Sequence, residues 1–260
     1  MDMQLAGKTA LVTGASKGMG LEIVRVLREE GVAVAAASRA VTAELAETGV
    51  ITLTGDLSDS EAPARIVAEA VTALGGLDIL VNNVGGGAAA PGAGFLDFDD
   101  AAWSSTFDLN LYAAVRTTRA ALPELLTSRG SVVTISSDSA RRPQSAPLPY
   151  GAAKAALNAV MKGLSAEYGP QGVRINTITP SSTLTALWTG EQSFGAGLAT
   201  AMNISNEELL ATLPAQMGMI TGRFIEPREI ATAVAYLASP LADSVHGANW
   251  IIDAGVSETV

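Results

Sequence analysis

Cysteine is absent from the 260 residues of the chain, and histidine occurs only once. Without cysteine there can be no disulfide, no thiolate nucleophile and no cysteine-ligated zinc site. The single histidine, His246, leaves too few ligands for a multi-histidine metal centre, so no metal site is predicted. We expect His246 to cap or pack near the last strand, and a role as a lone general base is the alternative.

Positive charge is also scarce, because 16 Lys and Arg residues stand against 26 Asp and Glu residues and leave a net charge of −10. Phosphate backbones repel such a chain, so nucleic acid is not an expected partner. Uncharged apolar runs stay below the ~18 residues that a transmembrane helix needs. Residues 1–10 lack the basic-then-apolar layout of a signal peptide. The sequence therefore predicts a cytoplasmic protein with no membrane partner.

Aromatic residues make up only 5% of the chain, whereas hydrophobic residues make up 48% and charged residues 16%. The apolar residues are mainly Ala, Val, Leu and Ile, a composition that suits strands covered on both faces by helices. Length alone allows one α/β domain or two small ones, and no linker-like break or repeat divides the chain.

Short apolar runs alternate with helical patterns along the sequence. Strands are predicted at Lys8–Thr13, Val32–Ser38, Ile51–Thr54, Leu77–Asn82, Ser131–Ser136, Val173–Ile178 and Gly247–Asp253. Helices are predicted at Met19–Glu30, Ala43–Glu47, from a capping box at residues 58–61 to about Leu74, and at Ala101–Ser128, Tyr150–Tyr168 and Pro227–Ala238. This alternation predicts an α/β fold: a doubly wound (Rossmann) parallel sheet of seven strands with helices on both faces, in a single domain spanning residues 1–260.

Residues 183–224 interrupt the alternation, because no strand fits between Thr185 and Phe224. A segment this long in a compact domain is usually functional. We predict that it is a helical substrate lid, in which Ser205 caps one helix and Trp188 binds the substrate. Its aromatic and methionine side chains suggest a medium-sized apolar ketone.

A glycine-rich turn, residues 13–20, lies between the first predicted strand and the first helix. Glycines at this place let the backbone approach a pyrophosphate, and the helix that follows offers unpaired N–H groups to the anion. The strand–turn–helix context predicts a dinucleotide site, although an ordinary βα turn can have the same composition.

The end of the second strand indicates which dinucleotide binds. A cofactor without a 2′-phosphate favours a carboxylate at this point, but the chain has Ser38 followed by Arg39. Arg39 can pair with a phosphate, and Lys17 adds a second positive charge on the same side. The prediction is NADP(H) rather than NAD(H).

Tyr150 and Lys154 are four residues apart on a predicted helix and so project from one face. A phenol with a pKa of about 10 is a poor acid or base at neutral pH, and a neighbouring ammonium is expected to lower that pKa. Ser137 ends the fifth strand, at the sheet edge where ligands bind, so its hydroxyl can reach a substrate oxygen. Taken singly, Ser137 is better explained as a helix or turn cap.

Together these residues resemble the short-chain dehydrogenase/reductase family. The motifs that carry the resemblance are residues 13–20, Asp56, residues 82–85, Asn110, Ser137, residues 150–154 and residues 180–185, and they extend it from Gly7 to Gly255. Three positions depart from the family pattern: Ser181 and Ala254 each stand at a common glycine, and Val84 at a common alanine.

The resemblance implies four catalytic residues and a homo-oligomer, a tetramer or a dimer. Tyr150 would exchange a proton with the substrate oxygen, Ser137 would orient that oxygen, Lys154 would bind the nicotinamide ribose, and Asn110 would hold a relay water. With the arguments above, the predicted cofactor-binding residues are Gly14, Ser16, Lys17, Gly18, Met19, Gly20, Ser38, Arg39, Asp56, Leu57, Asn83, Gly85, Lys154, Pro180, Thr183 and Thr185. The predicted substrate-binding residues are Ser137, Tyr150 and Trp188.

The predicted function is the NADPH-dependent reduction of a ketone or aldehyde to an alcohol. Three alternatives stay open: a reductase of 3-oxoacyl thioesters on a carrier protein, an NAD-dependent alcohol dehydrogenase, and a non-catalytic NADP-binding regulatory protein. The net charge of −10 argues against docking an acidic carrier.

Overall fold

Seven parallel strands form one sheet in the order β3-β2-β1-β4-β5-β6-β7 in the computed structural model, which describes residues 2–86, 93–191 and 193–257. The strands are β1 (Thr9–Thr13), β2 (Ala33–Ser38), β3 (Ile51–Thr54), β4 (Ile79–Asn82), β5 (Ser131–Ile135), β6 (Arg174–Pro180) and β7 (Asn249–Ile252). All seven predicted strands are confirmed. The strand order reverses between β1 and β4, so the crevice that such a reversal opens lies at their carboxyl ends.

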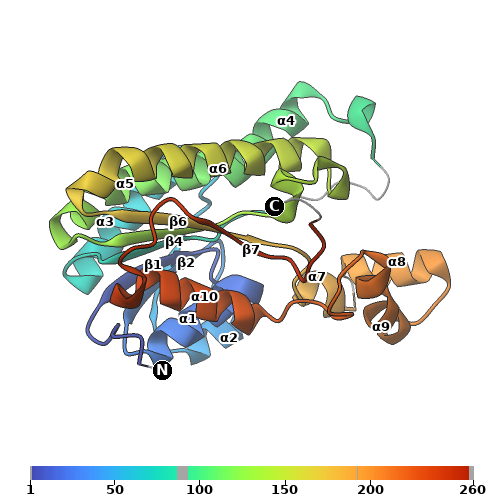
Figure 1. The fold of residues 1–260 in the computed structure, drawn as a ribbon, viewed down its shortest axis with the longest axis horizontal. Coiled ribbons are helices and arrows are strands. Elements are labelled where there is room, and N and C mark those ends of the chain that lie inside the picture. The colour runs from blue at the N-terminus through green and yellow to red at the C-terminus, as the bar shows by residue number, and fades with distance from the viewer. Residues whose placement is uncertain (1, 87–92, 192, 258–260) are drawn as a thin grey trace.

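Helices cover both faces of the sheet (Figure 1). One layer is α1 (Gly18–Glu29), α2 (Ala43–Glu47) and α10 (Pro227–Ala238), and the other is α3 (Ala62–Leu74), α5 (Ala113–Ser128) and α6 (Leu148–Tyr168). Each layer has its own apolar cluster against the sheet: Val12 of β1 belongs to the first, and Leu11 to the second. The predicted doubly wound single domain is confirmed.

The long helix predicted from Ala101 to Ser128 is wrong in one respect, because it is interrupted. The chain forms α4 (Asp100–Phe107), then one π turn over Asp108–Tyr112, and only then α5. The Asn110 side-chain amide donates to the Thr106 carbonyl oxygen (2.9 Å) and to that of Gly86 (2.8 Å). A side chain that competes for a helix carbonyl widens the turn, and single π turns often mark functional positions.

The predicted capping box at residues 58–61 is also wrong. The Ser58 hydroxyl donates to Asp56 at 2.7 Å instead of capping the helix, and α3 begins at Ala62 with no side-chain cap. Asp59 accepts a hydrogen bond from the Glu61 backbone N–H at 3.0 Å. These two Asp turns satisfy the local backbone groups ahead of Pro63, which fits the first helical turn because it has no N–H to leave unpaired.

The segment predicted as a lid is helical. It contains α7 (Ala186–Thr189), α8 (Phe194–Met202) and α9 (Asn206–Gln216), with residue 192 outside the described residues. Ser205 caps α9 as predicted, by accepting from the Glu208 N–H at 3.0 Å. A bridge between Thr183 and Ile225 ties the two ends of the segment together. The three helices project beyond the sheet, as Figure 1 shows.

Candidate functional site

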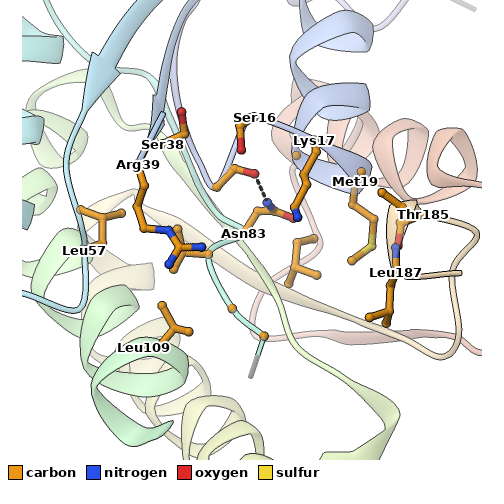
Figure 2. A pocket seen from close by; sticks show the side chains of 18 of the residues that line it. Ser16, Lys17, Met19, Ser38, Arg39, Leu57, Asn83, Leu109, Thr185 and Leu187 are labelled. Atoms are coloured by element: carbon orange, nitrogen blue, oxygen red, sulfur yellow. Dashed lines mark hydrogen bonds between the residues drawn. The ribbon is translucent and has the colours of Figure 1, made fainter. Parts of the chain in front are cut away.

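A cavity of about 560 Å³ opens at the carboxyl ends of β1, β2, β4 and β5, beside the lid. It brings together fifteen of the predicted site residues: Gly14, Ser16, Lys17, Gly18, Met19, Gly20, Ser38, Arg39, Asp56, Leu57, Asn83, Gly85, Tyr150, Lys154 and Thr185. In Figure 2, Arg39, Leu57 and Leu109 lie on one side of Asn83, and Met19, Thr185 and Leu187 lie on the other. An elongated ligand can therefore lie across the ends of the strands.

The β1–α1 turn forms a cradle that only glycine permits. Gly14 and Gly18 have φ angles of +66° and +57°, in the left-handed region. A Cβ atom at Gly20 would overlap the Gly14 carbonyl oxygen. α1 begins at Gly18 without a side-chain cap, which leaves first-turn N–H groups available to an anion.

Asn83, at the end of β4, holds this cradle in place. Its side-chain amide donates to the carbonyl oxygens of Thr13 (3.0 Å) and Gly14 (3.1 Å). The Thr13 hydroxyl accepts the Asn83 backbone N–H at 3.0 Å and donates to the Val81 carbonyl oxygen at 3.2 Å. Asn83 therefore acts on the dinucleotide region through the backbone of the turn.

The end of β2 carries the predicted 2′-phosphate determinants. The Ser38 hydroxyl is turned away into a hydrogen bond with the Ala40 carbonyl oxygen at 2.8 Å. The Arg39 and Lys17 side chains are both exposed and extend into the cavity (Figure 2). The pKa of Asp56 is lowered by its hydrogen bonds to Ser58 and, to a lesser degree, by the positive charge of Arg39. Arg39, directly after β2, and Lys17, in the β1–α1 turn, thus offer two exposed positive charges to the cavity.

Tyr150 and Lys154 face the same cavity from α6, which begins at Leu148. The Lys154 ammonium is buried, with 2% of the residue exposed, and donates to the Ile135 carbonyl oxygen at 3.0 Å. It lies 5.8 Å from the centre of the Tyr150 ring. The helical spacing brings the pair together as the sequence predicted.

The pKa of Tyr150 departs from its ordinary value in the direction opposite to the sequence prediction. Burial raises it, the neighbouring Ser137 hydroxyl lowers it, and the Asp138 carboxylate raises it further. Burial also lowers the pKa of Lys154 to about 8, so the ammonium begins to lose its charge closer to neutral pH than an exposed lysine does. The prediction failed because sequence spacing shows the neighbour of a phenol but not how deeply the phenol is buried.

Ser137 follows β5 and caps the short 3-10 turn Asp138–Ala140. Its hydroxyl accepts from the Ser139 hydroxyl at 2.9 Å and from the Ser139 N–H at 3.3 Å, and it donates to the Asp138 carboxylate at 3.3 Å. The cap interpretation and the catalytic interpretation are therefore compatible, because one hydroxyl serves the turn and also lies close enough to Tyr150 to affect its pKa.

Asn110 reaches the site from the π turn. Its side-chain oxygen accepts the Gly86 N–H at 2.9 Å, while its amide donates to Gly86 and Thr106. A Cβ atom at Gly85 would lie 2.9 Å from the Lys154 ammonium nitrogen and 3.1 Å from the Asn110 oxygen. Gly85 thus allows the loop to pass close to both polar groups. The rest of the small-residue loop, residues 87–92, lies outside the described residues.

Five predicted residues are not among those that line the cavity: Asn110 and Ser137, which stand directly beside lining residues, and Pro180, Thr183 and Trp188, which lie elsewhere. Trp188 is buried inside the lid, edge-on to Phe194 at 5.6 Å and tilted against Phe224 at 4.9 Å. Pro180 ends β6, and the Thr183 hydroxyl donates to the Ser181 carbonyl oxygen at 3.1 Å. These positions suit packing and loop shape.

Other residues line the cavity without having been predicted to do so. They include Leu109, Ser136, Leu187 and Phe194, from the π turn, the end of β5 and the lid. The Ser136 hydroxyl is buried and has no hydrogen-bond partner among the residues that the structure describes. Its place directly before Ser137 was the available signal, whereas nothing in the sequence distinguishes Leu109 from its apolar neighbours.

His246 precedes β7 and so lies near the amino ends of the strands, whereas the cavity lies at their carboxyl ends. In the described ranges, no group of three or more acidic or histidine side chains is arranged to hold a metal ion. Nor does any helix in the described part of the chain combine the length and apolar character that a membrane span requires.

The fold and the cavity define a doubly wound nucleotide-binding protein, and comparisons narrow the class. A family model described as "Enoyl-(Acyl carrier protein) reductase" matches residues 14–257. The D-threitol dehydrogenase of Mycolicibacterium smegmatis is 34% identical, over 98% of this chain and 94% of that protein.

Two solved structures are also similar. L-sorbose reductase from Gluconobacter frateurii, in complex with NADPH and L-sorbose, gives a TM-score of 0.91 at 28% identity over 100% of both chains. Carveol dehydrogenase from Mycobacterium avium, in complex with NAD, gives 0.85 at 28% identity over 96% of this chain and 98% of the other. The chain belongs to the short-chain dehydrogenase/reductase family, as its motifs predicted.

Proposed function

We propose that this protein is an NADP(H)-dependent oxidoreductase that reduces a ketone or aldehyde to an alcohol. The observation that carries the proposal is the presence of Tyr150 and Lys154 in the same cavity as the glycine cradle. A cradle alone supports nucleotide binding, whereas a half-buried phenol beside a buried ammonium supports proton transfer.

The residues present fit a dinucleotide. Gly14, Gly18 and Gly20 keep the turn free of side chains where a pyrophosphate needs close approach. Arg39 and Lys17 supply the positive charge that a 2′-phosphate needs. β2 ends at Ser38, which is not a carboxylate that would repel this phosphate. The similar structures contain NADPH in one case and NAD in the other, so the preference for NADP(H) rests on Arg39 and Lys17.

The protein's own groups manage the substrate oxygen and its proton. The bound reduced dinucleotide supplies a hydride. The Tyr150 phenol is protonated at neutral pH and, although burial raises its pKa, it is still acidic enough to protonate the alkoxide oxygen that forms as the carbonyl is reduced. Ser137 donates a hydrogen bond to the same oxygen, and Lys154 holds the ribose and helps to return a proton to Tyr150.

Two observations favour different substrate classes. The named relatives include D-threitol and L-sorbose enzymes, which favours a small polyhydroxylated substrate. The lid presents Leu187 and Phe194 to the cavity, which favours an apolar one, as in the relative named for carveol. A matched panel of a ketose, a cyclic monoterpene ketone and a short 3-oxoacyl thioester, assayed by NADPH oxidation, separates these and the carrier-linked alternative.

Tyr150→Phe tests the catalytic assignment. Removing the phenolic hydroxyl should abolish carbonyl reduction while leaving the Kd for NADPH within a few-fold of wild type, because the ring still packs in place. Turnover is followed at the NADPH absorbance and binding by nucleotide fluorescence. A variant that keeps a near wild-type rate contradicts the proposal, and tight NADPH binding without any wild-type turnover favours the regulatory-protein alternative.

Arg39→Ala tests the cofactor assignment. Losing a guanidinium–phosphate pair should lower the NADPH/NADH ratio of kcat/KM by about tenfold or more, since charge-assisted bonds contribute ~1.5–3 kcal/mol. The kcat with saturating NADH should not change. An unchanged cofactor ratio contradicts the role given to Arg39 and favours an NAD-dependent dehydrogenase.

A further inference from the structure

Asp138 is a buried acidic residue directly after Ser137, and it has no role in the function proposed above. Its side chain is 12% exposed. One carboxylate oxygen, Oδ1, accepts the Ser137 hydroxyl at 3.3 Å. A buried carboxylate needs compensating donors, because burial without them is strongly unfavourable.

The donors to the other oxygen, Oδ2, come from two different segments. The Ser181 hydroxyl donates to it at 3.0 Å, and the Arg142 guanidinium lies 3.4 Å away. Ser181 directly follows β6, and its own backbone N–H donates to Ile252 of β7 at 3.2 Å. Asp138 thus connects the turn after β5 to the loop after β6.

We propose that Asp138 is a positioning residue: Ser181 and Arg142 anchor it through one carboxylate oxygen, and it orients the Ser137 hydroxyl through the other. This inference rests on the proposed function, because it concerns the hydroxyl that receives the substrate oxygen. Ser181, which stands where the family commonly has glycine, becomes part of the catalytic framework in this chain.

The arrangement fixes what the Ser137 hydroxyl can do. Both lone pairs of its oxygen are used by Ser139, so the group is left to act as a donor. Its proton points to Asp138 across 3.3 Å, a long and therefore weak hydrogen bond. A carbonyl oxygen can take over this proton without disturbing the oxygen atom. The substrate therefore meets a donor already in place.

Asp138 also sets the charge around Tyr150. The charged groups near the phenol are Lys154 on α6, Asp138 on the turn after β5, and Arg142 paired to Asp138. The negative charge of Asp138 adds to the effect of burial in raising the pKa of Tyr150. Neutralising Asp138 should therefore make Tyr150 easier to deprotonate.

The experiment compares Asp138→Asn, Ser181→Ala and the double variant as full-length enzymes. In carbonyl reduction, Asp138→Asn should lower kcat by about 10- to 100-fold, as displaced reacting groups do, with the Kd for NADPH unchanged. Ser181→Ala should lower kcat by about tenfold. The double variant should match Asp138→Asn, because both changes break one chain of contacts.

Two readouts separate positioning from general damage. The deuterium isotope effect on kcat, measured with NADPH deuterated at the transferred position, should rise in both single variants because the chemical step becomes slower. In alcohol oxidation, the acid limb of the kcat/KM profile should move to lower pH in Asp138→Asn. Ser181→Ala should not move it down, since the carboxylate remains. Asp243→Asn is the control and should leave these readouts unchanged. Asp243 lies 4.0 Å from Arg174, at the amino end of β6, and its side chain is 88% exposed.

Wild-type values of kcat, isotope effect and pH limb in Asp138→Asn overturn the inference, as does an additive double variant. Thermal unfolding shows whether Asp138→Asn folds. If it does not, a wild-type kcat in Ser181→Ala is by itself enough to overturn the inference. A wild-type enzyme that reduces no carbonyl overturns the proposed function together with this inference. An active enzyme with unaffected variants overturns the inference only.

Discussion

At the scale of single residues, the buried ammonium of Lys154 lowers the stability of the folded protein. Its ammonium is buried and has one hydrogen-bond partner among the described residues, the Ile135 carbonyl oxygen. Burial disfavours the charged form and lowers the pKa to about 8 from 10.5. The folded protein therefore bears a desolvation penalty at neutral pH, which is consistent with the role proposed for Lys154.

Replacing this lysine should stabilise the protein at neutral pH. Lys154→Met removes up to ~3 kcal/mol of desolvation penalty, and it leaves the Ile135 carbonyl oxygen without a donor at a cost of about 1 kcal/mol. Its free energy of unfolding at pH 7 should exceed that of wild type by ~2 kcal/mol, while carbonyl reduction is lost. Urea unfolding and the NADPH assay measure the two effects.

The pH dependence gives this prediction its sign. Below about pH 8 both the folded and the unfolded wild type carry the ammonium. Between about pH 8 and 10.5 the folded state releases its proton first, so wild-type stability rises with pH and the advantage of Lys154→Met disappears. Lys162→Met, on the exposed side of α6, should show no such trend. A pH-independent difference would contradict the assignment.

At the scale of single residues, the sequence predicted which residues form the site better than it predicted their burial and contacts. Tyr150 and Lys154 were found because four-residue spacing fixes a shared helix face. The direction of the Tyr150 pKa and the Asp138–Ser181 contact were missed. Burial depends on what covers a group, and this contact joins residues after two different strands. Neither fact has a local signature.

At the scale of elements, the β1–α1 turn is the clearest case of a backbone that dictates its residue. A Cβ atom at Gly20 would overlap the Gly14 carbonyl oxygen and lie 2.5 Å from the Asn83 side chain. Gly20→Ala should therefore displace the cradle, lower the free energy of unfolding by ~1–3 kcal/mol and weaken NADPH binding by about tenfold or more. Urea unfolding and fluorescence titration report these changes.

The matched control lies in α6. Gly163 is helical, and a Cβ atom there would meet nothing within 4 Å. Gly163→Ala should therefore raise stability by about 1 kcal/mol, the usual helix preference for alanine, with unchanged NADPH affinity. Equal affinities in Gly20→Ala and Gly163→Ala would show that the turn does not hold the cofactor.

Periodicity located the elements but not their irregularities. The helix break at Asp108–Tyr112 was missed, because Asn110 competes for the Thr106 carbonyl only when Gly86 of a distant loop holds its side chain. The capping box failed because Ser58 found an acceptor in Asp56, two residues upstream. In both places a side chain satisfies a tertiary or turn contact that a helical pattern does not encode.

At the scale of the whole molecule, β3 and β7 are the two edge strands of the sheet, and the β7 edge carries a partly exposed aromatic side chain. No strand pairs with the outer side of β7 in the part of the chain that the structure describes. On this edge Trp250 stacks on Tyr236 of α10, with ring centres 5.3 Å apart and planes at 14°, and remains 36% exposed. An unpaired strand edge beside a partly exposed aromatic pair is a surface on which a second copy of the chain can pack.

We therefore expect the homo-oligomer that the family resemblance implies, with copies meeting about a two-fold axis across β7 and α10. Light scattering should give at least twice the chain mass for wild type. Trp250→Glu should reduce it, since a buried unpaired carboxylate opposes association, and the loss should reverse partly near pH 4 as the carboxyl becomes protonated. Leu96→Glu, at a side chain exposed away from any strand, should keep the wild-type mass. A monomeric wild type would contradict the prediction and show that the β7 edge stays exposed to water. A Trp250→Glu variant with the wild-type mass would show that the copies meet on another face.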